Sequence, residues 1–213
     1  MKYQAIFFDF DGVILDSVHV KTQAFAAMFR QYGPEIEQAV VDYHLNNGGV
    51  SRYKKFEYYY TKLLNKPIDQ ATLKALGKEF ESLALQGVLD APFIPGAQET
   101  LKQVREHGIP AFVASGTPEE EIKLIVNKRN LSPYFLEVHG SPRKKQEIIT
   151  DISKRYSFDL SRCLFIGDAM NDYDAASSTG SQFLGIVPDL NESPFPAGTW
   201  VKQKLELLPG EMP

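Results

Sequence analysis

Short apolar segments divide the chain in the way expected of a sheet protein. Five of them predict strands, and the central ones are apolar almost without interruption, which is typical of parallel strands covered on both faces. Helical patterns lie between them. The sequence therefore predicts an α/β fold, a Rossmann-like parallel sheet with helices on both faces. The five segments are Tyr3–Phe10, Ile109–Ala114, Leu136–His139, Cys163–Ile166 and Gln182–Val187.

About a hundred residues separate the first two predicted strands, far more than a crossover connection needs. Apolar residues in this interval recur at helical spacing, for example Phe25, Met28, Phe29 and Tyr32. We therefore predict an α-helical cap inserted after the first strand, at residues 16–90. Residues 1–15 and 91–213 would then form the α/β catalytic core.

The composition narrows the class of protein. Apolar residues make up 43% of the chain, enough for a real interior, and the net charge of -4 gives no reason to expect a nucleic-acid partner. The single Cys163 is expected to be a buried thiol in a reducing compartment. No apolar segment reaches the roughly 18 residues of a membrane span, and no signal peptide is apparent. We expect a cytoplasmic protein without a membrane partner, either a monomer or a weak homodimer.

Polar residues with reactive side chains follow four of the predicted strands. Asp9 and Asp11 end the first, and Ser115 and Gly116 end the second. Lysines follow the third, and Asp168 and Asp172 follow the fourth. Because ligands bind beyond the carboxyl ends of parallel strands, these groups are expected to converge. Clustered carboxylates repel one another unless a cation or a proton holds them. Oxygen ligands favour a hard ion such as Mg²⁺, which usually shares the phosphate of its substrate. The sequence thus predicts a magnesium site and a phosphorylated substrate.

These segments, DFDGV, the serine after the second strand, the downstream lysine and GDAMND, resemble in order the four motifs of the haloacid dehalogenase superfamily. The insert matches the helical-cap group, which includes phosphoglycolate phosphatases and β-phosphoglucomutases. The resemblance covers about 140 residues of the core. It implies a Mg²⁺-dependent phosphatase that hydrolyses a small phosphomonoester, a sugar phosphate or similar metabolite, through an aspartyl-phosphate intermediate.

The resemblance also implies residue roles. Asp9 would be the nucleophile, and Asp11 the acid and base, provided that its surroundings keep it protonated at the start. Ser115 and Gly116 would bind the phosphoryl group. Thr117, Pro118 and Glu120 have the pattern of a helix start, with Thr117 as the N-cap.

Metal binding and charge neutralisation complete the implied site. The metal ligands would be the carboxylates of Asp9 and Asp168 and the main-chain carbonyl of Asp11. Asp172 would bind the ion through water or orient the lysine. Lys145 is our choice for the phosphate-neutralising residue, and Lys144 is the alternative.

Two alternatives remain open at the level of the sequence. The segment Gly49-Val50-Ser51-Arg52 resembles one in β-phosphoglucomutases, whose arginine binds a second phosphate, so Arg52 is a candidate substrate ligand in either a phosphatase or a phosphomutase. The mutases carry a histidine where this chain has Lys21, which favours the phosphatase, with Lys21 as a further candidate contact. A receiver-like signalling or binding domain is the non-enzymatic alternative.

Overall fold

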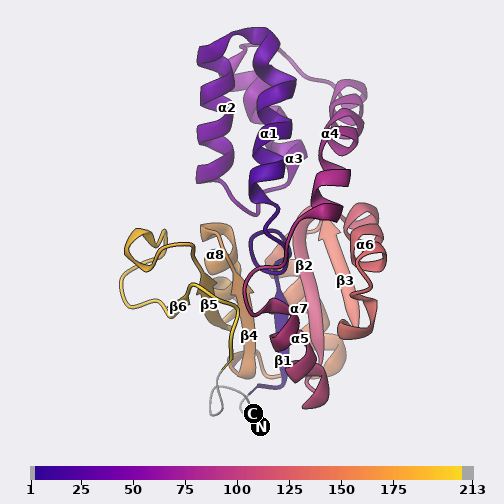
Figure 1. The fold of residues 1–213 in the computed structure, drawn as a ribbon, viewed down its shortest axis with the longest axis vertical. Coiled ribbons are helices and arrows are strands. Elements are labelled where there is room, and N and C mark those ends of the chain that lie inside the picture. Colours follow the sequence, from indigo (N-terminus) through magenta and orange to yellow (C-terminus); the bar gives the residue numbers. More distant parts are fainter. Residues whose placement is uncertain (1–2, 208–213) are drawn as a thin grey trace.

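The computed structural model describes residues 3–207 of the chain. Its strands are β1 (Ala5–Phe8), β2 (Ala111–Pro118), β3 (Glu137–Ser141), β4 (Cys163–Gly167), β5 (Gln182–Ile186) and β6 (Val201–Lys202). They form one six-stranded sheet in the order β3-β2-β1-β4-β5-β6, and every pair is parallel (Figure 1). The apolar strand β1 lies between β2 and β4, where both neighbours shield it.

Helices cover both faces of this sheet, because successive side chains of a strand point to opposite faces. In β1, Phe8 packs in the cluster that contains Leu101 and Ile122 of α5 (Ala97–Glu106) and α6 (Glu119–Lys128). Phe7 packs on the other face with Ile148 of α7 (Lys145–Tyr156) and with α8 (Met170–Thr179).

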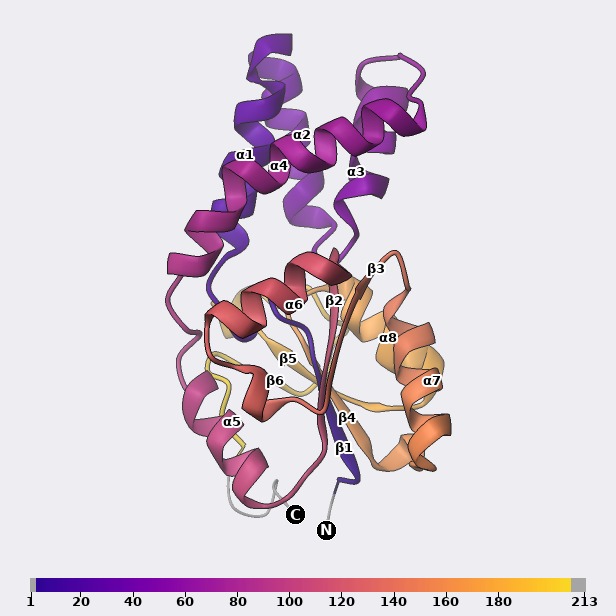
Figure 2. The same cartoon turned by 90° about the vertical axis from the view of Figure 1, so that its right-hand side faces the viewer.

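The long interval between β1 and β2 is helical. It contains α1 (Val18–Phe29), α2 (Pro34–Asn46), α3 (Arg52–Tyr58) and α4 (Gln70–Asp90), together with a π-helical turn at Tyr59–Leu63. These helices lie beyond the carboxyl ends of the strands (Figures 1 and 2). They share an apolar cluster of their own, in which the rings of Phe25 and Phe80 are 4.3 Å apart. The predicted α/β class with a helical insert after the first strand is confirmed.

Two chain segments connect the insert to the sheet, and they pair with each other. The main-chain N–H of Asp16 donates to the carbonyl of Pro92 at 2.9 Å, and that of Ile94 donates to the carbonyl of Ile14 at 3.0 Å.

The carboxylate of Asp69 caps α4 by accepting from the N–H of Thr72. The division of the chain into a cap at 16–90 and a core stays a prediction.

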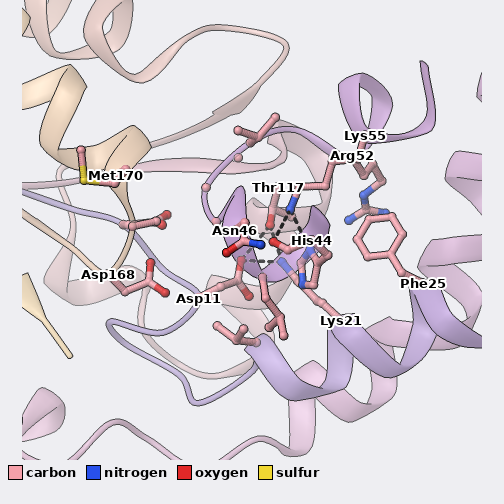
Figure 3. Close-up of a pocket in the computed structure, with 18 of the residues that line it drawn as sticks. Asp11, Lys21, Phe25, His44, Asn46, Arg52, Lys55, Thr117, Asp168 and Met170 are labelled. Carbon is pink, nitrogen blue, oxygen red and sulfur yellow. Dashed lines mark hydrogen bonds and ion pairs between the residues drawn. The ribbon is translucent and has the colours of Figure 1, made fainter. Parts of the chain in front are cut away.

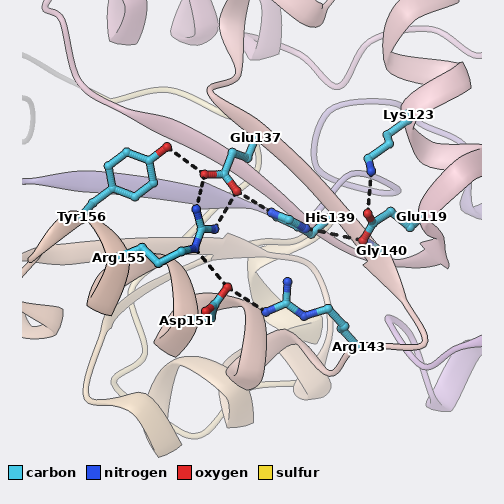
Figure 4. A network of polar contacts seen from close by, with 9 residues as sticks. All are labelled: Glu119, Lys123, Glu137, His139, Gly140, Arg143, Asp151, Arg155 and Tyr156. Atoms are coloured by element: carbon cyan, nitrogen blue, oxygen red, sulfur yellow. Dashed lines mark hydrogen bonds and ion pairs between the residues drawn. The ribbon is translucent and has the colours of Figure 1, made fainter.

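A polar network joins the edge strand β3 to α7 (Figure 4). The Glu137 carboxylate accepts from both terminal nitrogens of Arg155 at 2.7 Å, and also from Tyr156. His139 contacts the same carboxylate at 2.7 Å. These contacts lower the pKa of Glu137 to about 2, with Arg155 as the main cause. The bidentate pair between Glu137 and Arg155 thus joins the edge strand β3 to α7.

The structure differs from the sequence prediction around the end of β2. The strand continues through Thr117 to Pro118, with an irregular register after Ala114, and α6 begins at Glu119. The predicted Thr117 N-cap is therefore wrong, because that hydroxyl bonds elsewhere, as described below. The strand β6 was also not predicted, since two residues are too short to show a pattern. Among residues 3–207, no helix is both long and apolar enough to span a membrane.

Candidate active site

A cavity of about 350 Å³ lies between the insert and the carboxyl ends of the strands (Figure 3). The sheet side contributes carboxylates, and the insert contributes cations. From the sheet side come Asp9, Asp11, Gly116, Thr117 and Asp168; from the insert come Lys21, His44, Arg52 and Lys55. The cavity thus has acidic and basic walls.

Asp9 lies directly after β1 and is almost completely buried. Its Oδ2 is 2.8 Å from Nζ of Lys145, while its Oδ1 is buried without a hydrogen-bond partner in the part of the chain that the structure describes. Burial, together with the carboxylates of Asp172 and Asp11, raises the pKa of Asp9 to about 7 in spite of the Lys145 ammonium. A buried carboxylate with one unpartnered oxygen and a raised pKa suits a position next to a cation.

Asp168 and Asp172 lie close to Asp9. One carboxylate oxygen from each of the three falls within 4.8 Å of the others, a grouping that suits a metal ion. Burial and the Asp9 charge raise the pKa of Asp168 well above its ordinary value. Gly12 leaves the space for this arrangement, because a Cβ at that position would lie 2.3 Å from Oδ2 of Asp168. The donor set therefore fits a hard divalent cation.

Asp172 also positions the lysine. Its Oδ1 forms an ion pair with Nζ of Lys145, and its Oδ2 accepts from the main-chain N–H of Ala169 at 3.1 Å. Burial opposes the charge of Lys145, but Asp172 and Asp9 outweigh it and raise the pKa of Lys145 above its usual value. Lys144, the alternative, is exposed just before α7 begins.

Asp11 is surrounded by donors. Its Oδ1 accepts from the Ser17 hydroxyl at 2.6 Å, while its Oδ2 accepts from Thr117 at 3.0 Å and forms an ion pair with Lys21. Lys21 also donates to Oγ1 of Thr117 at 2.7 Å. Burial raises the pKa of Asp11, but Lys21 and the hydroxyl donors more than compensate, so the pKa is lowered. The acid role of Asp11 requires surroundings that keep it protonated at the start, whereas its partners here stabilise the carboxylate. The role itself stays a prediction.

The predicted phosphate-binding pair lies at the end of β2. Gly116 lines the cavity, and a Cβ there would meet the carbonyl oxygen of Gly49 at 2.3 Å, so the insert approaches the strand end closely. Ser115 is buried, and its Oγ accepts from the N–H of Thr117 at 3.1 Å. The amide of Asn171 also donates to the carbonyl of Gly49, at 3.2 Å. The loop before α3 therefore sits against the end of β2 and the first turn of α8.

Arg52 lines the cavity but is already paired. Its guanidinium forms an ion pair with Glu121 of α6, both side chains being 5% exposed, and it lies 4.4 Å above the ring of Phe80. Glu121 lies in the first turn of α6. The structure shows that it joins α6 to the insert.

Sequence reasoning missed two further residues of the cavity, His44 and Lys55. Lys55 lies three residues after Arg52, a spacing that brings both onto one face of α3, and this signal was available in the sequence. No comparable signal indicated His44, because its approach to Lys55 depends on how α2 and α3 pack.

The family model described as haloacid dehalogenase-like hydrolase matches residues 3–180. The chain belongs to the haloacid dehalogenase-like hydrolase family. The phosphoglycolate phosphatase of Pseudomonas putida is 23% identical over 197 residues, which cover 87% of this chain and 70% of that protein. The family resemblance inferred from the motifs is thus confirmed, as is the prediction of an enzyme.

Solved structures of other haloacid dehalogenase-like proteins share the fold. A protein of Haemophilus somnus, described as a predicted phosphoglycolate phosphatase, superposes with a TM-score of 0.71 at 17% identity and covers 96% of this chain and 95% of its own. The β-phosphoglucomutase of Clostridium difficile superposes with a TM-score of 0.74 at 19% identity, covering 95% and 91%. At such identities these neighbours establish the architecture of the sheet and insert, and nothing about the substrate.

Proposed function

We propose that the protein is a Mg²⁺-dependent phosphatase that hydrolyses a small phosphorylated metabolite through a phosphoryl group carried on Asp9. The observation that carries this proposal is the position of Asp9, which ends a buried central strand with one oxygen bound to Lys145 and the other bare. A rigid strand end holds a nucleophile in a fixed orientation, which lowers the entropy cost of the reaction.

The ion would be held by the carboxylates of Asp9 and Asp168 and by the main-chain carbonyl of Asp11, with Asp172 at the edge of the site. The raised pKa values of Asp9 and Asp168 support this assignment, because both carboxyls need a neighbouring positive charge to stay ionised near neutral pH. When bound, Mg²⁺ supplies charge neutralisation to the phosphoryl oxygens.

In the first step, an oxygen of Asp9 attacks phosphorus and the bond to the leaving oxygen breaks. Lys145 would neutralise a phosphoryl oxygen, and Ser115 and the N–H of Gly116 would donate to others. In the second step, water attacks phosphorus and releases inorganic phosphate, regenerating the Asp9 carboxylate. Each displacement is easier than direct hydrolysis.

Asp11 would protonate the leaving oxygen and then deprotonate water. To act as an acid it must first gain a proton, which the ion pair with Lys21 opposes. A phosphoryl group that enters beside Asp11 brings like charge and competes for Lys21. Both effects favour protonation of Asp11, so substrate binding itself would prepare the acid.

Relatives named phosphoglycolate phosphatase support a phosphatase acting on a small ester. The neighbouring β-phosphoglucomutase keeps a phosphomutase as the second candidate. Arg52, the residue that would bind a second phosphate in a mutase, is engaged by Glu121, which favours the phosphatase. A cytoplasmic location and a monomer or weak dimer belong to the same proposal.

The test is release of inorganic phosphate from a panel of small phosphomonoesters, with Mg²⁺ and then with a chelator. We expect release that the chelator abolishes and that added Mg²⁺ restores. Asp9→Asn should lower turnover by roughly 10⁴-fold or more, as expected for loss of a nucleophile. Phosphate release that persists without any divalent ion would contradict the proposal. Efficient conversion of β-glucose 1-phosphate to glucose 6-phosphate with a bisphosphate primer would favour the mutase.

A further inference from the structure

Three cations of the insert line the cavity, and they differ in their partners. Lys21 pairs with Asp11, and Arg52 pairs with Glu121. Lys55 forms no ion pair with any carboxylate among residues 3–207, although its side chain is only 2% exposed. Its Nζ contacts Nδ1 of His44 at 2.7 Å and the His44 carbonyl at 3.3 Å. Lys55 is therefore a cavity-lining ammonium whose partners are both neutral.

His44 acts only as an acceptor for Lys55. Burial and the adjacent Lys55 charge lower the pKa of His44 to about 3, so the ring is neutral. Since Nδ1 faces an ammonium, which can only donate, the ring proton resides on Nε2. The imidazole thus orients Lys55 without neutralising it.

Keeping this cation in place is unfavourable for folding. Burial, helped by the charge of Lys21, lowers the pKa of Lys55 to about 7. The ring of Phe25, 5.7 Å from Nζ, offers a weak cation–π contact, which recovers little of the lost hydration. A buried charge without a counter-ion, facing a cavity, is typical of a group that meets its counter-ion in the ligand.

The position of Lys55 fits the far end of a substrate. In Figure 3 the labelled carboxylate of Asp168 lies on one side of the cavity, while Lys55 and Arg52 lie on the other. A phosphoryl group at Asp9 and Lys145 would leave the remainder of a small ester directed toward the insert. Lys21 lies beside Asp11, at the phosphoryl end, and Arg52 is paired with Glu121, so Lys55 is the cation available at the far end.

We propose that Lys55, oriented by His44, determines the specificity of the site by binding a carboxylate of the substrate at the end remote from the phosphoryl group. The proposal rests on the proposed phosphatase function. A single ammonium matches the single charge of a carboxylate. A second phosphate, with nearly two charges, would require Arg52 to leave Glu121.

The experiment compares two esters of equal size, the phosphate esters of glycolic acid and of glycolamide, which differ only in a carboxylate or a neutral amide. Wild-type protein should prefer the acid. In Lys55→Met the ratio of the two kcat/KM values should fall by roughly 10- to 100-fold, since a hydrogen bond to a charged group is lost. Lys54→Met removes an exposed lysine from the same helix and should keep the wild-type ratio.

The outcomes separate the two proposals. If wild-type protein releases phosphate from both esters, and Lys55→Met leaves their ratio unchanged, the role of Lys55 is refuted while the phosphatase stands. The role of Lys55 would also be refuted if wild-type protein preferred the amide, or preferred an ester with a second phosphate in place of the carboxylate. If no ester is hydrolysed under any metal condition, the phosphatase itself fails. Lys55→Met is expected to fold, for the reason developed below.

Discussion

Replacing Lys55 with methionine should stabilise the protein, although it removes a hydrogen bond. Methionine has a similar length and no charge, so it fills the same buried space beside Phe25 without the loss of hydration that an ammonium suffers. The expected gain follows from the pKa of Lys55, which folding lowers from 10.5 to about 7.

The sign follows from which state binds the proton more tightly. Because the folded pKa is the lower one, the unfolded chain binds the Lys55 proton more tightly, and protonation favours unfolding. The resulting cost is fully present below pH 7 and disappears as the pH rises toward 10.5. Linkage gives a cost of about 4 kcal/mol at pH 7 and about 2 kcal/mol at pH 9.

Urea unfolding of wild-type protein and Lys55→Met at these two pH values tests the calculation. The free energy of unfolding of the variant should exceed that of the wild type by several kcal/mol at pH 7, and the excess should shrink by about half at pH 9. Lys54→Met removes the exposed lysine directly before Lys55 in α3 and controls for the general effect of removing one positive charge. A Lys55→Met protein no more stable than wild type at pH 7, or an excess that does not change with pH, would refute the reasoning.

Two further predictions concern side chains that join parts of the site. Glu121→Gln leaves the buried Arg52 charge without its partner and should lower the free energy of unfolding by about 3 kcal/mol in the same urea assay. The double variant Glu121→Leu with Arg52→Met removes both charges and should recover most of that loss. Equal stability of Glu121→Gln and wild type would contradict this. Gly12→Ala puts a Cβ against the Asp168 carboxylate and should raise the Mg²⁺ concentration for half-maximal activity by roughly tenfold, in line with other disturbances around metal ligands. Gly33→Ala is its matched control, because Gly33 also has a positive φ but has nothing within 4 Å of the added Cβ. An equal rise of the half-maximal Mg²⁺ concentration in both variants would show that backbone strain alone is responsible.

The residues that could be predicted from the sequence are those fixed by one strand or helix. Asp9 and Asp168 follow buried apolar strands, so their positions at one edge of a parallel sheet depend on sheet topology alone. The choice between Lys144 and Lys145 needed the starting residue of α7, which a local pattern defines poorly.

Contacts between distant segments could not be predicted. Thr117 has the sequence of a helix cap, yet its hydroxyl bonds to Asp11 and Lys21 because the insert folds back over β2. The pairing of Arg52 with Glu121 joins residues 69 positions apart and depends on how the insert sits on α6. Such contacts depend on tertiary packing, which hydrophobic periodicity and local helix or strand propensity do not predict.

The central claim is that the phosphoryl group is transferred first to the carboxylate of Asp9. An Asp11→Asn variant tests this claim most directly. With dinitrophenyl phosphate the leaving group needs no acid, so the first step should proceed, whereas the second step lacks its base and should stall. We predict a burst of dinitrophenolate of about one equivalent per active site, and a phosphoryl group on the peptide that contains Asp9 after rapid acid quench. A burst that leaves Asp9 unmodified, or a phosphoryl group found on another residue, would contradict the account.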